Sequence, residues 1–230
     1  MANFLTSSIG KKFIQAVSGA FLFVFLLLHA TINVFSVRDS FAGEFGSPEG
    51  WFAQGCEFMA LPVVDVMVPI LALGFLIHIC YGIYLTIGNY KARGGQRYEV
   101  ASKAASDSWA AKNMVVLGLL ILGLLAFHLT HFWAKMQLQD FIGGEAEDPY
   151  LLLCFTFKNW WMVVIYIAWF VILWFHLVHG FWSMFQTIGW NSKRWLGRLK
   201  VIGVVVATLI CLAFVAVAVN AFLQANALIA

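Results

Sequence analysis

Histidine is the residue type in this chain most able to do chemistry, and all six histidines lie inside long apolar stretches. An ionisable side chain is costly to place in a membrane and usually serves a function there. Imidazole nitrogens ligate metal ions and carry protons. The sequence therefore predicts metal ligation or proton transfer within a membrane. The six positions are His29, His78, His128, His131, His176 and His179.

The surroundings of four of these histidines repeat along the chain. A glycine precedes both His29 and His128 by ten residues, and a glycine follows both His78 and His176 by four residues. The second copy of each pattern lies 99 or 98 residues after the first. We interpret the chain as two copies of a helix pair, each carrying two histidines, followed by a fifth helix without histidine.

Depth in the apolar stretches sorts the same four histidines into two pairs. His29 and His128 lie nine and seven residues before the charged residue that closes their stretch. His78 and His176 lie thirteen and eighteen residues after the charged residue that opens theirs. The two pairs therefore differ in depth by about six to nine residues, which corresponds to roughly 10–14 Å along a helix. This pattern predicts two bis-histidine metal centres, one above the other.

Haem fits such centres better than other metal groups do. Haem iron accepts axial histidines, and glycines near the ligands let a large flat group approach a helix. A covalent haem would need C-x-x-C-H, which is missing, so the haem would be of b type. Zinc or non-haem iron would favour nearby carboxylates, and these stretches hold almost none. His131 and His179 fall outside the repeat and are interpreted as hydrogen-bonding residues.

Composition indicates the elements that must position these histidines. Hydrophobic residues make up 62% of the 230 residues and charged residues only 11%, whereas a soluble domain carries roughly 25% charged residues. Each apolar stretch exceeds the roughly 20 residues that cross a bilayer as a helix. We expect an all-α integral membrane bundle of five transmembrane helices in a single domain, residues 1–230. The expected helices are about 13–37, 61–90, 113–134, 159–190 and 200–226. No cleaved signal peptide is expected.

The charges predict an orientation. Eleven of the fourteen lysines and arginines fall on one side of the expected bundle, and nine of the eleven acids fall on the other. Basic residues favour the cytoplasmic side. The N-terminus is therefore expected in the cytoplasm and the C-terminus outside.

Several classes of site find no support in the sequence. The four cysteines are scattered without a C-x-x-C pair, which argues against an iron–sulfur cluster or a thiolate zinc site. Neither G-x-G-x-x-G nor a P-loop occurs, so nucleotide and flavin binding have no motif.

Taken together, the histidine motifs resemble those of a known family. The chain is similar, over nearly its whole length, to the cytochrome b membrane-anchor subunit of succinate:quinone oxidoreductases (succinate dehydrogenases and fumarate reductases) of the five-helix, two-haem type. The motifs that carry the resemblance are Ser18-Gly19-x9-His29-x3-Asn33, His78-x3-Gly82-x-Tyr84, His128-Leu129-x-His131-Phe132-Trp133 and His176-x3-Gly180-Phe181-Trp182.

This resemblance implies cofactors, partners and a cellular location. His29 and His128 would hold a distal haem b, and His78 and His176 a proximal haem b. An iron–sulfur subunit and a flavoprotein subunit with FAD would dock on the cytoplasmic side of the bacterial inner membrane. Electrons would pass between menaquinone or menaquinol and succinate or fumarate. The chain alone would have no activity on dicarboxylates.

Two departures from the family pattern concern protons. Some two-haem members carry a glutamate two residues before the fourth ligand, where this chain has Trp174. Some members use an acid at the outer end of the second helix, and no residue here matches it cleanly. Glu57, Asp65 and His131 are candidates for the quinone site by location alone.

Three other functions compete with this interpretation. A cytochrome b anchor of a hydrogenase or formate dehydrogenase would keep the haems and change the partner. A transporter with a histidine proton relay would also show internal repeats, but it would not absorb visible light. A structural anchor with vestigial histidines would show no redox response.

Overall fold

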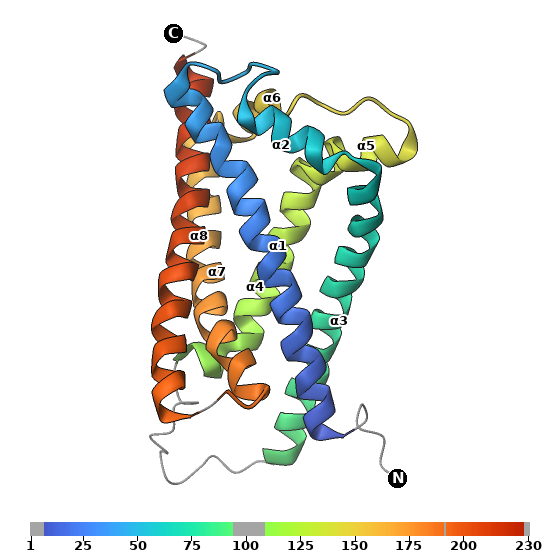
Figure 1. Ribbon diagram of the computed structural model, residues 1–230, viewed down its shortest axis with the longest axis vertical. Coiled ribbons are helices and arrows are strands. Elements are labelled where there is room, and N and C mark those ends of the chain that lie inside the picture. Colours follow the sequence, from blue (N-terminus) through green and yellow to red (C-terminus); the bar gives the residue numbers. More distant parts are fainter. Residues whose placement is uncertain (1–6, 94–108, 191, 228–230) are drawn as a thin grey trace.

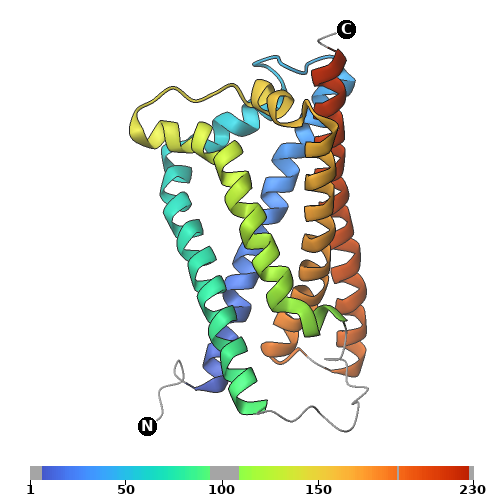
Figure 2. The ribbon, with the colours of Figure 1, turned by 180° about the vertical axis from the view of Figure 1, so that it is seen from behind.

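The computed structural model describes residues 7–93, 109–190 and 192–227, and every regular element in these ranges is helical. Five of the helices there are long and apolar enough to cross a membrane. They are α1 (Ser8–Ala42), α3 (Pro62–Arg93), α4 (Trp109–His131), α7 (Trp160–Thr187) and α8 (Lys193–Ala227). In Figure 1 they run along the long axis, with α3 and α8 at the two flanks. Figure 2 shows α4 on the face opposite α1.

The helices differ from the expected bounds mainly at their ends. Helix α1 begins five residues before residue 13, where the Ser7 side chain accepts a hydrogen bond from the Gly10 amide. It ends at Ala42, five residues after residue 37, and is capped by Gly43, whose φ of 72° favours glycine. Helix α8 begins at Lys193, seven residues before the expected start. The helices extend past the apolar stretches because a polar turn at a helix end can stay helical in water, outside the lipid.

Three short helices and a 3-10 turn cover one end of the bundle (Figure 1). They are α2 (Trp51–Met59), η3 (Trp133–Lys135), α5 (Gln137–Ile142) and α6 (Pro149–Phe157). We call this the acid end because acidic residues gather in its short helices, in the segments that join them and in the first turn of α3. These residues are Glu44, Glu49, Glu57, Asp65, Asp140, Glu145, Glu147 and Asp148. The expected helix ranges did not include α2, α5 or α6.

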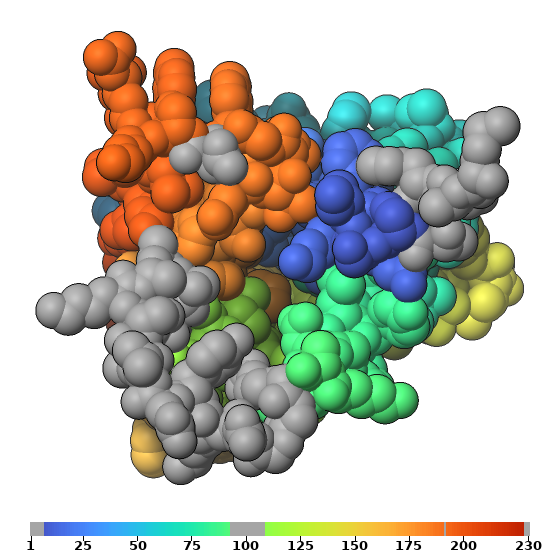
Figure 3. Space-filling view, turned by 90° about the horizontal axis from the view of Figure 1, so that it is seen from below, coloured from blue at the N-terminus to red at the C-terminus, as the bar shows by residue number. Residues whose placement is uncertain are grey.

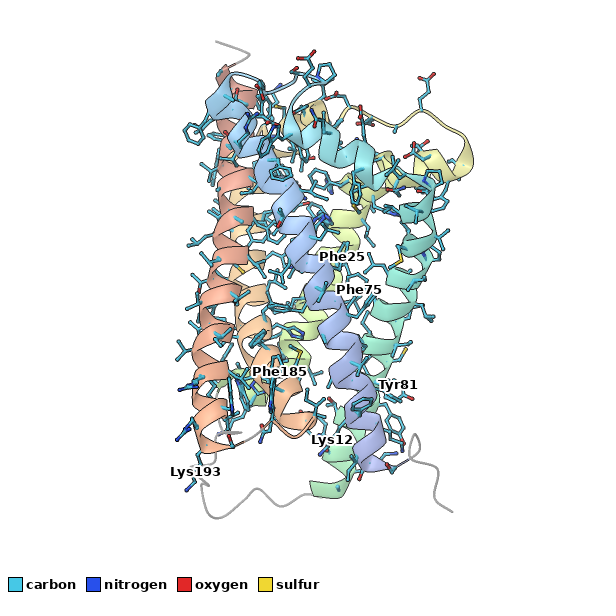
Figure 4. The ribbon with its side chains drawn as sticks, viewed as in Figure 1. Lys12, Phe25, Phe75, Tyr81, Phe185 and Lys193 are labelled. Carbon is cyan, nitrogen blue, oxygen red and sulfur yellow. The ribbon has the colours of Figure 1, made fainter. Side chains whose placement is uncertain are left out.

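Lysines and arginines gather at the opposite end, which we call the basic end. Lys12 and Lys193 mark it in Figure 4, and Figure 3 looks onto it, with α1 and α3 beside the α7–α8 turn. Its described residues are Lys11, Lys12, Lys91, Lys112, Lys193, Arg194, Arg198 and Lys200. Arg97 and Lys103, also assigned to this side, lie outside the described residues.

Close approach of helix backbones holds the bundle together. At Gly203 of α8, an added Cβ would lie 2.8 Å from the Phe181 ring of α7, so only glycine fits there. A hydrogen bond from Trp174 Nε1 to Thr208 Oγ1, 2.9 Å long, joins the same two helices. Asn220 of α8 donates to Ser40 Oγ of α1 at 2.8 Å. These contacts place α1, α7 and α8 around the buried core.

A buried carboxylate fastens the short helices to α1. The Asp39 side chain is fully buried and accepts hydrogen bonds from the backbone amides of Trp51 and Phe52, at 3.0 and 2.8 Å. It also accepts from the Tyr150 hydroxyl at 2.7 Å and pairs with Arg38. Burial and the bond to Asp39 raise the pKa of Tyr150. Asp39 thus joins α1, α2 and α6.

Candidate functional site

The structure brings His29 and His128 together toward the acid end of the bundle. His29 projects from α1 and His128 from α4. Their ring centres are 5.9 Å apart and their planes stand at 88°. We call these two residues the acid-end pair.

His78 and His176 form a second pair nearer the basic end. His78 lies on α3 and His176 on α7. Their ring centres are 6.2 Å apart, with 72° between the planes. We call them the basic-end pair. The four residues that repeat in the sequence thus meet two by two, each pair formed by two different helices.

Two glycines fix the depth of the basic-end pair on the neighbouring helices. An added Cβ at Gly19 of α1 would lie 3.2 Å from Cε1 of His78, and one at Gly118 of α4 would lie 3.9 Å from Cε1 of His176. On each helix the glycine precedes the acid-end histidine by ten residues. Ten residues of α-helix rise about 15 Å, which gives the spacing of the two pairs along the bundle.

Both pairs have a separation that suits two ligands of one metal ion. Two nitrogens about 2 Å from a shared ion, each about 1 Å from its ring centre, place the ring centres about 6 Å apart. Aromatic side chains in ordinary contact also lie in this range. The arrangement of two pairs on four helices therefore carries more weight than either distance alone.

Aromatic side chains lie on several sides of the acid-end pair. Phe25 stacks on His29 at 5.5 Å, and Phe214 of α8 lies 5.7 Å from the same ring. Trp169 lies 5.6 Å from His128. Figure 4 shows Phe25 and Phe75 midway along α1 and α3, with ring centres 6.5 Å apart. A low-polarity environment of this kind excludes water from the rings.

Several buried polar atoms near the histidines have no hydrogen-bond partner among the described residues. They include Nδ1 of His128 and of His176. Beside His128, the Tyr166 hydroxyl and Trp169 Nε1 also have no partner among the described residues. Both residues are buried, Tyr166 at 2% exposed and Trp169 at 8%. Native proteins satisfy most buried polar atoms with protein, water or ligand. These donors suit a bound group that carries oxygen acceptors. A haem, with its carboxylates, would be such a group.

The two remaining histidines take no part in the pairs. Nδ1 of His131 lies 2.8 Å from the Phe127 carbonyl oxygen within its own helix turn. His179 packs edge-on against Trp182, with ring centres 4.9 Å apart. Its Nδ1 is buried without a partner in the described part of the chain.

The acidic candidates of the sequence analysis lie at the acid end. Asp65 lies in the first turn of α3 and accepts a hydrogen bond of 2.7 Å from Gln137. Glu57 lies on α2. Within the residues described, no three histidine, cysteine or acidic side chains are grouped as metal ligands.

An apolar groove of about 360 Å³ lies between α1 and α2. One of its lining residues, Leu28, directly precedes His29 in the sequence. The lining residues are Leu28, Thr31, Ile32, Phe35, Trp51, Gln54, Gly55 and Phe58. Glu57, Asp65 and His131 are not among the residues that line it.

Three polar residues contact the pairs: Gln15, which the sequence did not single out, and Ser18 and Asn33, which were motif residues without a predicted role. Gln15 and Ser18 lie against His78, and the amide of Asn33 lies 3.5 Å from His29 Nδ1. Gln15 lies four residues before the motif glycine Gly19 and Asn33 four residues after His29, so helical spacing places each on the same face of α1 as that motif residue. Comparisons with protein-family models, curated proteins and solved structures found no match for this chain.

Proposed function

We propose that this chain is a membrane cytochrome that holds two haem b groups. His29 and His128 would ligate the haem toward the acid end, and His78 and His176 the haem toward the basic end. The observation that carries the proposal is a pair of imidazoles with ring centres about 6 Å apart at each of two depths, which lie about 15 Å apart along the helices. Bound haem would supply one-electron exchange at each depth.

The protein's own part is to place the ligands and keep the interior dry. Each pair draws its ligands from two helices, so ligand spacing depends on how α1, α3, α4 and α7 pack. The phenyl rings beside His29 exclude water. The hydroxyl of Tyr166 and Nε1 of Trp169 are free to donate hydrogen bonds to the bound group.

A quinone fits the groove between α1 and α2. The groove is apolar, as an isoprenoid substrate requires, and one of its lining residues, Leu28, directly precedes His29 in α1. Thr31 and Gln54 offer the polar side chains on its walls. We infer menaquinone or menaquinol as substrate there, in preference to a site at Glu57, Asp65 or His131.

The same proposal makes the chain the anchor of a succinate dehydrogenase or fumarate reductase. The motif resemblance supports this step, and the matching contacts of Gly19 with His78 and Gly118 with His176 support the two-copy repeat. An iron–sulfur subunit and a flavoprotein subunit with FAD would dock at the basic end. That end would face the bacterial cytoplasm, with the C-terminus outside.

Purification of the tagged chain from its native membranes in mild detergent tests the proposal. We expect two further subunits, one with flavin and one with iron–sulfur clusters, and a b-type absorption that succinate or menaquinol reduces. The His78→Ala variant should keep the partners and lose electron transfer between succinate and quinone. A preparation whose partners oxidise hydrogen or formate, or which carries no b-type absorption, would overturn it.

A further inference from the structure

One edge of the His78 ring rests on α1. Its Nδ1 lies 3.3 Å from Nε2 of Gln15 and 3.4 Å from Oγ of Ser18. Its Cε1 lies against Gly19, where a Cβ would be only 3.2 Å away. Positions three and four residues apart share one face of a helix. The Nδ1 side of the ring therefore faces α1, and Nε2 is left for the interior of the bundle.

The Ser18 hydroxyl indicates which ring nitrogen of His78 carries the hydrogen. Ser18 Oγ donates to the backbone carbonyl of Gln15 at 3.1 Å. A hydroxyl has a single hydrogen to donate, so toward His78 this oxygen can only accept. Because Ser18 is buried, at 8% exposed, water does not compete for the contact. The hydrogen of the neutral imidazole therefore belongs on Nδ1.

The Gln15 amide adds an acceptor for the same hydrogen. Its Oε1 is buried and has no partner among the described residues, while Nε2 is the atom placed toward His78. The oxygen and nitrogen of a side-chain amide are assigned from their hydrogen bonds. With Nδ1 protonated, the orientation that forms a hydrogen bond is the one that turns Oε1 toward the ring.

We propose that Gln15 and Ser18 are positioning residues that hold His78 with its hydrogen on Nδ1, leaving the lone pair of Nε2 for the metal ion it shares with His176. The proposal rests on the haem function proposed above. Metal-ligating histidines commonly donate their other N–H to such an acceptor, which orients the ring and makes the ligand more basic.

At the acid-end pair, the described polar side chain beside His29 comes from the histidine's own helix. The Asn33 amide lies 3.5 Å from Nδ1 of His29, and the same Nδ2 donates to the His29 carbonyl at 2.8 Å. One of the two hydrogens of this amide is thus given to the backbone of α1, the helix that carries His29 itself, whereas Gln15 reaches His78 from a different helix. Changes at Gln15 should therefore alter one haem and leave the other unchanged.

Redox titration of the purified complex, followed by visible absorption, tests this proposal. The basic-end haem is identified as the component that the His78→Ala variant loses. A carboxylate is a stronger acceptor than an amide, so Gln15→Glu should stabilise the oxidised form of that haem. Its oxidised-to-reduced ratio at fixed potential should rise about tenfold, a shift of about 59 mV to lower potential. Gln15→Leu and Ser18→Ala should shift it the opposite way.

Thr86→Val is the matched control, because the Thr86 hydroxyl bonds within α3, to the Gly82 carbonyl. It should leave both potentials unchanged. Loss of one haem from Gln15→Leu but not from Gln15→Glu would also support the proposal. Two haems with wild-type potentials in Gln15→Glu and Gln15→Leu, or loss of the same haem from both, would overturn it. A wild-type chain without haem would overturn the proposed function as well.

Discussion

At the scale of single residues, chemistry could be read from spacing, but contacts could not. The positions of His29, His78, His128 and His176 along the apolar stretches allowed pairing by depth, and the structure brings the same residues together. Spacing alone did not reveal that Gln15 touches His78, because the two residues are 63 positions apart and their contact depends on how α1 crosses α3.

Gly19 offers a test of the space beside His78. An added Cβ would lie 3.2 Å from the ring, so Gly19→Val should push the ring out of line and lower haem content from two to about one per chain. Haem per chain is measured by the pyridine haemochrome assay. Gly88→Val on α3 is the control, since nothing among the described residues lies within 4 Å of its added Cβ. Equal haem content in the two variants would contradict this account.

At the scale of elements, apolar length predicted the spanning helices and failed for the short ones. Helices α2 and α6 have nine residues each and α5 has six, too few to form reliably without tertiary contacts. What positions α2 is Asp39, whose partner Tyr150 is 111 residues away in the sequence. A single sequence gives no sign of such a contact.

Asp39 should therefore govern the stability of the acid end. Each of its oxygens accepts from two donors: Oδ1 from Trp51 N and Arg38, Oδ2 from Phe52 N and the Tyr150 hydroxyl. In Asp39→Asn, the new amide N–H group must face one of these donor pairs. The free energy of unfolding should fall by about 3 kcal/mol.

Thermal unfolding in detergent measures this loss as a lower Tm. Glu49→Gln also removes one negative charge from the acid end, but this residue is exposed. It should change Tm little, since exposed charges contribute about 0–1 kcal/mol. An Asp39→Asn variant as stable as Glu49→Gln would show that the buried carboxylate does not hold α2 and α6 in place.

At the scale of the whole molecule, the charge pattern separates the two ends of the bundle. Helices α1, α3, α4, α7 and α8 run between the basic end and the acid end (Figure 1). The described acids are concentrated at the acid end. The sequence was sufficient for this division because it depends only on which connection each charge falls in. Because basic residues favour the cytoplasmic side, this division predicts that the basic end faces the cytoplasm.

Labelling of single cysteines in intact cells tests the orientation. Cys56, Cys80, Cys154 and Cys211 are first replaced by Ala. A membrane-impermeant maleimide should then label Glu49→Cys at the acid end in intact cells, and Lys193→Cys at the basic end only after permeabilisation. The reverse pattern would place the basic end outside and rule out docking of cytoplasmic subunits there.

The most direct test of the central claim is to measure which haem signal each histidine supports. Electron paramagnetic resonance of the oxidised complex, with haem content per chain, should show two low-spin b-type haems in the wild type. His29→Ala and His128→Ala should lose the same signal, and His78→Ala and His176→Ala the other, while His131→Ala keeps both. A folded wild-type chain without haem, or losses that group His29 with His78, would contradict the account.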